Sequence, residues 1–365
     1  MLSPVLYLLI FLRKLSSGKK PLRILVIQGA KIGDLICTTP IFREIKRKFP
    51  DSYLSVMVIS KTKDILRNNP RLDEILIIDD YQGISGKMKL LSKLRREKYD
   101  WVFSLLPDSF DNLIGLWSLI PNRVVTTYKQ SGEITKLLSV FSNKRLEYKR
   151  HLSLLRHYFN LLKFVGIKET SEEKEIFIKP AEEEKAANFL KSHNLNENDL
   201  LVGISIKAGI DLKEWEQDKF VQLADRLAEE LNAKIIFIGG PADSSLIEEA
   251  QRKMKNTSIS AANNFRLYET PALMKKLKLF ISVDTGPLYI ADTVGTPVVS
   301  ISGPCDAREQ SPSGKKVIII QKKINCVPCS FVIIGARKCK EGHLRCLRET
   351  TPEEVFKAAK ELIKS

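Results

Sequence analysis

The hydrophobic positions of the chain fall into short apolar runs that are separated by amphipathic segments. Unbroken runs of four apolar residues, at 24–27 and 235–238, indicate buried strands. Segments 39–48 and 217–231 instead place their apolar residues on one face with the spacing of a helix. Strands and helices that alternate with short loops predict parallel sheets covered on both faces, so we expect an α/β fold.

This alternation occurs twice along the 365 residues, which predicts two domains. The first series predicts strands at 23–27, 53–59, 74–78 and 101–105 and helices at 39–48, 88–98 and 150–165. The second series predicts strands at 200–206, 234–238, 279–283 and 297–301 and helices at 217–231, 271–276, 288–294 and 352–363. The polar stretch 168–184 separates the two series. We therefore expect an N-terminal helix at 1–20, domains at 21–178 and 179–350, and a C-terminal helix at 351–365.

The first residues form an apolar stretch, 2–12, which is followed by four basic residues, Arg13, Lys14, Lys19 and Lys20. A spanning helix needs about 20 apolar residues, so this stretch is too short to cross a bilayer. A secretory signal carries its positive charge before the apolar region, whereas here the charge follows it. The pattern favours an amphipathic helix at an anionic membrane surface. A helix packed on the protein itself or on a partner is the alternative.

The charge balance favours an anionic partner. The chain has 59 Lys and Arg against 43 Asp and Glu, a formal net charge of +16. Basic residues gather in the first half, at Lys87, Lys89, Lys93, Arg95, Arg96 and Lys98, and at Arg123, Lys129, Lys136, Lys144, Arg145, Lys149 and Arg150. No nucleic-acid-reading signature accompanies them, so nucleic acid is not the expected partner. Each lysine taken alone is explained equally well as part of a solvated helix face.

A turn at residues 28–34 joins the first strand to a helix. Its sequence, QGAKIGD, is not the glycine fingerprint of dinucleotide-binding enzymes, because Lys31 occupies a position where that fingerprint has glycine. Asp34 projects from the carboxyl end of the strand, where open α/β sheets bind their ligands. A carboxylate there can accept a proton from an incoming hydroxyl group. It can equally serve only to complement a helix dipole, and the local sequence leaves both interpretations open.

A second turn, at residues 284–287, follows the strand at 279–283. Thr285 offers a hydroxyl group, Gly286 permits close approach of a ligand, and Pro287 begins a helix whose free N–H groups form an anion site. Together with Asp284, this turn suits a diphosphate. A capped helix start that binds no ligand is the alternative.

Two further segments lie at strand ends in the second half. Asp243 follows Gly239-Gly240-Pro241, where a carboxylate can hold a ribose hydroxyl group. Lys213 lies between a strand and a helix, where it can neutralise a leaving phosphate with Trp215 packed beneath it. Surface lysines are common, so the Lys213 motif is weak by itself.

Taken together, these segments resemble glycosyltransferase family 9, the ADP-heptose:lipopolysaccharide heptosyltransferases. The likeness covers roughly residues 22–363, and several motifs in order are more specific than any one. The matching motifs are Ile32-Gly33-Asp34-Leu35, Thr38-Thr39-Pro40, Lys213-x-Trp215, Gly239-Gly240-Pro241, the run from Ser282 to Pro287, Gly295-Thr296-Pro297-Val298-Val299 and Gly303-Pro304.

The resemblance implies a GT-B fold, in which two Rossmann-like domains face a central cleft. It places the acceptor on the first domain and the nucleotide-sugar on the second, and implies an inverting transfer without an obligatory metal. Asp34 is then the catalytic base, with Gly33 and Lys31 on the acceptor side. Donor binding is assigned to Lys213, Asp243, Asp284, Thr285, Gly286 and Pro287. Small hydroxylated residues usual beside the first motif are replaced by Gly29, Ala30 and Lys31, so acceptor contacts are expected to differ.

The cysteines allow a separate prediction. Cys326, Cys329, Cys339 and Cys346 can supply four thiolates to a structural zinc ion, with His343 as a substitute ligand. The spacing between Cys339 and Cys346 is wider than in a second C-x-x-C pair. Reduced thiols or a redox-sensitive pair are therefore the alternatives.

The sequence thus predicts an inverting heptosyltransferase, peripheral on the inner face of the cytoplasmic membrane, with a nucleotide-sugar donor and an anionic glycolipid acceptor. Its expected product belongs to lipopolysaccharide core or a related glycolipid. Two alternatives stay open, namely a family member that transfers another sugar and a catalytically silent nucleotide-sugar-binding scaffold. Retention of both Asp34 and Lys213 weighs against the silent scaffold.

Overall fold

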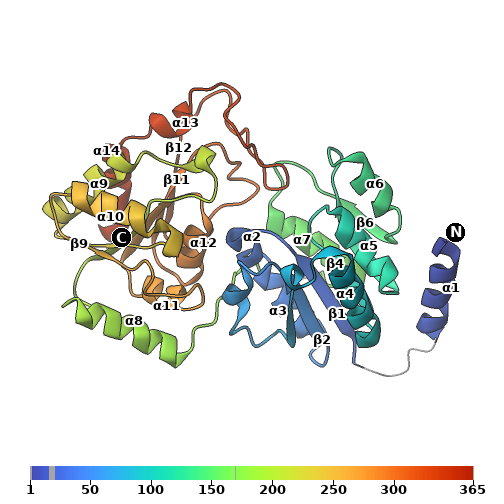
Figure 1. Ribbon diagram of the computed structural model, residues 1–365. Helices are drawn as coiled ribbons and strands as arrows, with labels where there is room; N and C mark the ends of the chain where they lie inside the picture. The colour runs from blue at the N-terminus through green and yellow to red at the C-terminus, as the bar shows by residue number, and fades with distance from the viewer. Residues whose placement is uncertain (1, 16–20, 169, 365) are drawn as a thin grey trace. The chain divides into compact units, whose positions relative to one another are not determined.

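The computed structural model describes residues 2–15, 21–168 and 170–364. The chain divides into two compact units, Met1–Lys174 and Glu175–Ser365 (Figure 1). The change of unit therefore falls inside the polar stretch 168–184. Each unit contains one six-stranded sheet, and all strand pairings within the two sheets are parallel, which confirms the predicted α/β class.

In unit 1 the strand order is β3-β2-β1-β4-β5-β6. The strands are β1 (Arg23–Gln28), β2 (Tyr53–Val58), β3 (Glu74–Ile77), β4 (Trp101–Ser104), β5 (Asn122–Thr127) and β6 (Lys144–Glu147). The helices are α1 (Leu2–Leu15), α2 (Ile32–Ile36), α3 (Thr39–Lys48), α4 (Gly83–Glu97), α5 (Ser109–Trp117), α6 (Glu133–Ser139) and α7 (Leu154–Leu162), with short 3-10 turns at Lys63–Leu66, Ile78–Asp80 and Lys163–Val165. On one sheet face, Leu25 and Ile27 of β1 pack with Leu90 of α4 and Ile114 of α5.

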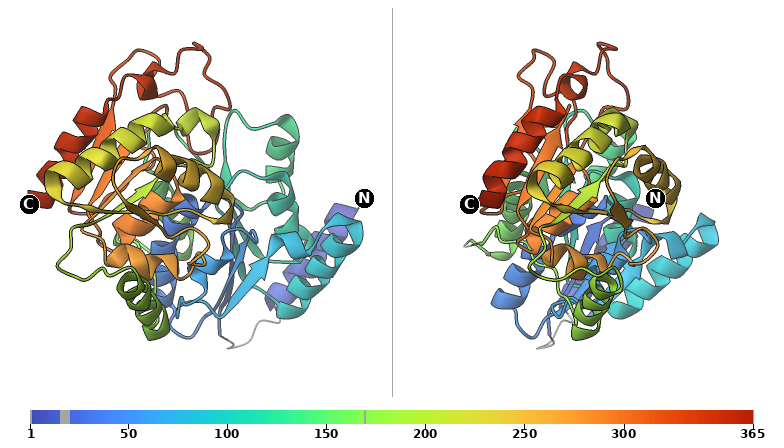
Figure 2. Two further views of the ribbon diagram at one scale, coloured as in Figure 1. Left: turned by 60° about the vertical axis from the view of Figure 1, so that its left-hand side comes forward. Right: turned by 90° about the vertical axis from the view of Figure 1, so that its left-hand side faces the viewer.

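In unit 2 the strand order is β12-β11-β10-β7-β8-β9. The strands are β7 (Leu201–Ser205), β8 (Lys234–Phe237), β9 (Ser258–Ser260), β10 (Leu279–Val283), β11 (Val298–Ser302) and β12 (Val317–Gln321). The helices are α8 (Pro180–Ser192), α9 (Gln217–Leu231), α10 (Ser244–Lys253), α11 (Thr270–Lys275), α12 (Gly286–Thr293), α13 (Arg345–Arg348) and α14 (Pro352–Lys364), with 3-10 turns η4 (Asp211–Lys213) and η5 (Pro241–Asp243). The C-terminal α14, red in Figure 2, packs against α9.

The same strand order is present in both units, if each is counted from its own first strand. That first strand is central, with the second strand on one side and the fourth on the other. The direction of winding reverses between β1 and β4 and again between β7 and β10. Open α/β sheets bind ligands in the crevice at such a switch point, beyond the carboxyl ends of the strands. Each unit therefore has one predicted ligand position of this kind.

Some predicted boundaries were wrong. The helix expected at 150–165 begins only at Leu154, because His151 has a φ of 64° and breaks the helical path. The helix expected from residue 88 begins five residues earlier, at Gly83. Four strands, β5, β6, β9 and β12, were not predicted. β6 and β9 have no run of buried apolar residues that would mark a strand. β12 was missed although residues 317–320 are an unbroken apolar run.

Helix α1 carries apolar residues on its outer side. Val5, Leu8 and Phe11 are each more than half exposed, whereas Ile10 is buried. Tyr7 lies against the guanidinium group of Arg123, which is 5.6 Å from the ring centroid. No helix within the described ranges is both long and apolar enough to cross a membrane. Lys19 and Lys20, part of the predicted basic flank, lie outside the described residues, as do the side chains of Arg13 and Lys14.

Candidate functional site

Asp34 lies in the first turn of the short helix α2, directly after the turn that follows β1. Its Oδ2 accepts the backbone N–H of Lys31 at 3.2 Å, so it caps the start of this short helix. Beneath it, the fully buried side-chain amide of Gln28 donates to Thr38 and to the hydroxyl group of Tyr158, both at 2.9 Å. These contacts fix the turn that presents Asp34.

The capping role of Asp34 leaves room for a second one. A carboxylate has two oxygens and about four acceptor positions, so the contact with the Lys31 N–H does not by itself define the role of this side chain. Burial and then the negative charge of Asp34 raise the pKa of Tyr158 well above its usual value. Asp34 therefore acts electrostatically on the interior of unit 1 while its own side chain stays partly exposed.

In unit 2, the switch point between β7 and β10 holds an ion pair. Lys213 Nζ of η4 lies 2.6 Å from Asp284 Oδ2, which follows β10, although the two residues are 71 positions apart. The hydroxyl group of Tyr289 donates to Asp284 Oδ1 at 2.9 Å. The thiol of Cys305, after β11, hydrogen-bonds with Asp284. The ends of three neighbouring strands thus contribute to one polar cluster.

The pair is electrostatically stable in its charged form. Burial is the largest effect on Asp284 and favours its neutral form, but the charge of Lys213 and the hydrogen bonds from Cys305, Lys213 and Tyr289 together outweigh it and hold the pKa of this carboxyl group below its usual value. Burial is likewise the largest effect on Lys213 and disfavours its charged ammonium group, but the interactions with Asp284 and Cys305 together outweigh it and the pKa of Lys213 is raised. Burial, followed by the charge of Asp284, raises the pKa of the Cys305 thiol, which therefore stays neutral at physiological pH.

Thr285 and Gly286 form the start of α12, next to this cluster. Thr285 is the N-cap residue, yet its hydroxyl group makes no capping hydrogen bond. Gly286 is the first helical residue and Pro287 the second, and the next N–H, that of Leu288, donates to the Thr285 carbonyl oxygen at 3.1 Å. The uncapped start of α12 can accept an anion, since its N–H groups and dipole favour negative charge.

Asp243 lies at the carboxyl end of β8, the neighbour of β7. Its Oδ2 accepts the backbone N–H of Gly240 at 2.8 Å and so stabilises η5. A Cβ atom on Gly239 would lie 2.9 Å from that of Asp243, so only glycine fits in this turn. The sequence-predicted donor residues Lys213, Asp243 and Asp284 are thus placed on one edge of one sheet.

Trp215 belongs to the core. It is almost fully buried, packs edge-on against Phe220, and donates its indole N–H to the Thr350 carbonyl oxygen at 3.0 Å. Trp215 therefore anchors the segment that carries Lys213 to the C-terminal part of the chain. The position of Trp215 two residues after Lys213 is therefore explained by its packing in the core, and no contact between the indole and a ligand is needed.

Sequence reasoning missed Tyr289 and Cys305. Tyr289 lies on α12, five residues after Asp284 in the sequence. This short spacing could have indicated that the two side chains lie close together. Cys305 follows Gly303-Pro304 directly after a buried strand, the same kind of position that had singled out Asp284.

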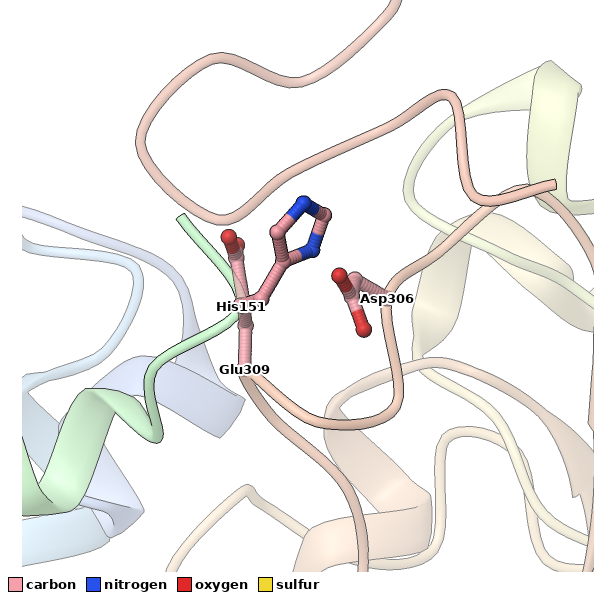
Figure 3. A group of neighbouring side chains, drawn as sticks. All are labelled: His151, Asp306 and Glu309. Atoms are coloured by element: carbon pink, nitrogen blue, oxygen red, sulfur yellow. The ribbon is translucent and has the colours of Figure 1, made fainter. Parts of the chain in front are cut away.

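The loop after β11 is organised by buried acids. Figure 3 shows Asp306 and Glu309 on this loop, and both side chains are buried. Glu309 Oε2 accepts the N–H of Val332 at 2.9 Å, and the N–H of Asp306 donates to the Ser330 carbonyl oxygen at 3.2 Å. These contacts tie the start of the loop to the cysteine-containing segment that follows β12.

The structure gives the predicted zinc site no support. Cys326, Cys329, Cys339 and Cys346 all lie in the described part of the chain, but no three of them bring their sulfur atoms within 4.8 Å of one another. Four ligands of a tetrahedral zinc ion must lie within about 2.3 Å of one metal position, and hence close to one another. His343 instead accepts the backbone N–H of Arg345 at 3.1 Å.

Two Rossmann-like units, each with polar groups at its switch point, define a protein of the GT-B fold class. The solved structure of a family 9 glycosyl transferase from Veillonella parvula DSM 2008 matches this fold with a TM-score of 0.81 at 24% identity, covering 96% of this chain and 99% of that chain. The structure of E. coli heptosyltransferase WaaC with ADP has a TM-score of 0.67 at 16% identity, covering 93% of this chain and 100% of that chain.

Sequence comparison gives the family. The model of glycosyltransferase family 9 (heptosyltransferase) matches residues 87–333. Lipopolysaccharide heptosyltransferase 3 of Escherichia coli (strain K12) is 27% identical over 290 residues, which are 75% of this chain and 80% of that relative. The chain belongs to glycosyltransferase family 9, which confirms the resemblance seen in its motifs.

Proposed function

We propose that the protein transfers heptose from ADP-heptose to a lipopolysaccharide core or related glycolipid, with inversion at the anomeric carbon and without an obligatory metal. The observation that carries the proposal is the Lys213–Asp284 pair at the switch point of unit 2, beside the start of α12. A cation and a helix N-terminus at one position suit a diphosphate. A solved family relative that contains ADP agrees with this choice of nucleotide.

Different residues of the donor site bind the diphosphate and the sugar. Lys213 and the start of α12, with Thr285, Gly286 and Pro287, bind the diphosphate and neutralise the charge that develops on it as ADP leaves. Asp284 accepts hydrogen bonds from hydroxyl groups of the sugar, and its contact with Tyr289 fixes the carboxylate. Asp243 accepts a ribose hydroxyl group at the end of β8.

The acceptor residues belong to unit 1. Asp34 takes the proton from the attacking acceptor hydroxyl group, whose oxygen forms the new bond to the anomeric carbon as the bond to the ADP oxygen breaks. One displacement of this kind inverts the configuration. Gly33 and Lys31 form the backbone beside the attacking group, and the exposed Lys31 suits an anionic acceptor.

The place of action is the inner face of the cytoplasmic membrane, to which α1 attaches the enzyme peripherally. The exposed apolar side chains of α1 enter the interfacial region, and the basic residues that follow attract anionic head groups. Ile10 and Tyr7 hold the helix to unit 1 from its other side. No nucleic acid takes part.

A donor-binding experiment tests the proposal. Calorimetric titration of the purified protein with ADP, UDP and CDP should give a clear preference for ADP. Mass spectrometry of a reaction with ADP-heptose and a core glycolipid should then detect the extended acceptor. Binding of another nucleotide in preference to ADP would contradict ADP-heptose as the donor and indicate a different nucleotide-sugar.

A further inference from the structure

The inner side of helix α6 is polar. Thr135 Oγ1 lies 2.7 Å from Ser109 Oγ of α5, and the Thr135 carbonyl oxygen accepts a hydrogen bond from the Asn112 amide at 3.3 Å. One turn further along α6, Ser139 is buried and donates its hydroxyl group to the Lys136 carbonyl oxygen at 2.7 Å. Hydrogen bonds therefore hold this side of α6 to α5.

The outer side of α6 is apolar. Ile134 and Leu137 lie one turn apart and are 68% and 66% exposed, and Val140, three residues further, is 52% exposed. A surface helix normally has the reverse arrangement, with its apolar stripe against the core and its polar residues in water. We call these three side chains the apolar side of α6. Contiguous exposed apolar side chains of this kind mark sites of contact with a protein or a membrane.

Helix α6 extends from the ligand edge of the sheet towards α1. It follows β5, whose carboxyl end lies at the same edge as that of β1, because β1, β4 and β5 are parallel neighbours. At its other end, Nε of Arg123 donates to the Phe141 carbonyl oxygen at 2.9 Å. The same guanidinium group lies against Tyr7 of α1. The segment that ends α6 and the helix α1 thus both contact one arginine (Figure 1).

The charge around the apolar side of α6 is positive. Residues 108–150, which form α5, β5, α6, β6 and their loops, contain seven basic and four acidic residues. Of the acids, Glu133 is already paired with Lys136 at 2.7 Å. The others are Asp108 and Asp111 at the start of α5 and Glu147 on β6. Lys129, in the turn before α6, and Arg145, on β6 after it, are both exposed.

Arg145 emerges on the sheet face that carries α5. β5 and β6 are parallel with Arg145 opposite Val125, which is two residues after Arg123 on β5. A Cβ atom on Gly115 of α5 would lie 3.0 Å from the side chain of Arg123, so Arg123 points to the face that α5 covers. Side chains two residues apart on a strand share a face, so Arg145 points to it as well. An apolar helix side with cations before and after it suits an anionic bilayer, whose apolar interior lies beneath negative head groups.

Resting on the proposed function at the membrane, we propose that the apolar side of α6 is a second contact with the anionic lipid surface. Its three side chains enter the interfacial region, and Lys129 and Arg145 bind lipid phosphate groups beside them. Contacts through α1 and α6 together fix the orientation of unit 1, which a single helix would leave free to rotate. Since α6 begins at the ligand edge, this orientation holds the edge that carries Asp34 next to the bilayer in which a glycolipid acceptor is anchored.

Co-sedimentation with vesicles of phosphatidylethanolamine and about one third phosphatidylglycerol tests this proposal. The double variant Ile134→Ser/Leu137→Ser should bind these vesicles at least about tenfold more weakly than the wild type, because two apolar side chains no longer leave water. Arg145→Glu should also bind them more weakly, but should bind vesicles of phosphatidylcholine alone as the wild type does. Ile334→Ser removes an isoleucine of unit 2 that is 39% exposed, and this matched control should bind like the wild type.

Wild-type binding of the anionic vesicles by the double variant, with an unchanged melting temperature, would overturn the proposal. A dimeric wild type and a monomeric double variant in light scattering would also overturn it, because the apolar side of α6 would then bind a second copy of the chain. If deletion of residues 1–20 leaves binding unchanged while the double variant weakens it, α6 alone is the contact.

Failure of the proposed transferase function would look different. The double variant should keep wild-type affinity for ADP and should still act on an acceptor dispersed in detergent, since its substitutions lie outside the donor and acceptor sites. A wild type that binds vesicles through α6 but neither binds ADP nor extends the dispersed acceptor would reject the transferase function and leave the lipid contact standing.

Discussion

At the scale of single residues, Asp34 combines a structural contact with a proposed chemical role. Its contact with the Lys31 N–H can be kept by an amide oxygen, so Asp34→Asn separates the two. We expect turnover to fall by roughly 10²–10⁴-fold, since the variant lacks a base, while ADP affinity changes little. Steady-state kinetics measures the turnover, and thermal melting measures the stability of the variant. If Asp34 serves only as a cap, the substitution would cost at most about 1 kcal/mol of stability and activity would survive.

Lys213 is the second residue whose role a substitution can test. Lys213→Ala should weaken ADP binding by about 1.5–3 kcal/mol, the range for a hydrogen bond to a charged group. The variant also leaves Asp284 without its partner, and the unpaired carboxylate can repel the nucleotide by itself.

The double variant Lys213→Ala/Asp284→Asn resolves this ambiguity in calorimetric titrations with ADP. A loss that persists in the double variant supports a direct contact between Lys213 and phosphate. Full recovery of the affinity would mean that Lys213 acts only by neutralising Asp284. Lys219→Ala, which removes an ammonium group paired with Glu216 on the same segment, is the control for general charge effects.

The sequence predicted most of these residues from one rule, that ligands bind beyond the carboxyl ends of parallel strands. The rule placed Asp34, Asp284 and Asp243 at strand ends. It did not pair Lys213 with Asp284, because the register of β7 against β10 is a tertiary property. It also gave Trp215 a position beneath the lysine, whereas the indole packs in the core and bonds to Thr350.

At the scale of elements, α1 should act as the membrane contact. Deletion of residues 1–20 should release the protein from vesicles that contain anionic lipid, because each buried apolar side chain contributes about 1.5–3 kcal/mol. Co-sedimentation with vesicles measures the bound fraction, and ADP titration checks that unit 2 remains folded. The substitution Phe11→Ser, on the exposed side of the helix, should weaken binding in part. Unchanged co-sedimentation of the deletion variant would assign α1 to packing on the protein alone.

Helix α7 contains a buried histidine that makes unit 1 sensitive to acid. Burial lowers the pKa of His157 to about 4, and the ring bonds to Thr126 Oγ1 at 3.1 Å. The unfolded chain gains a proton below its pKa of about 6.5, whereas the folded chain does not, so stability falls as the pH drops from about 6.5 towards 4. The full effect is on the order of 3 kcal/mol.

Denaturant unfolding at pH 7 and pH 4.5 tests this contribution. The variant His157→Asn should be less stable than the wild type at pH 7, since it loses packing in the core. Its stability should nevertheless decline less between the two pH values, because it has no buried ring to protonate. An equal decline in both proteins would assign the acid sensitivity to other groups.

At the scale of the whole molecule, the α/β class and the two-unit organisation follow from the hydrophobic pattern. Central strands such as β1, β7 and β10 were predicted well because all or nearly all of their residues are buried. Edge strands β6 and β9 were not, since β9, for example, has three half-buried residues and no distinct pattern, whereas β12 was missed despite its apolar run at 317–320. The order of strands depends on long-range pairing, which the pattern along one chain does not contain.

The proposed transferase function is tested most directly by a transfer assay with the full-length protein, ADP-heptose and a core glycolipid that lacks its terminal heptose, followed by mass spectrometry. We predict an acceptor heavier by one heptose residue, formed by the wild type and by Lys219→Ala but scarcely by Asp34→Asn. Bound ADP with no change in the acceptor, or transfer of a different sugar in preference to heptose, would contradict it.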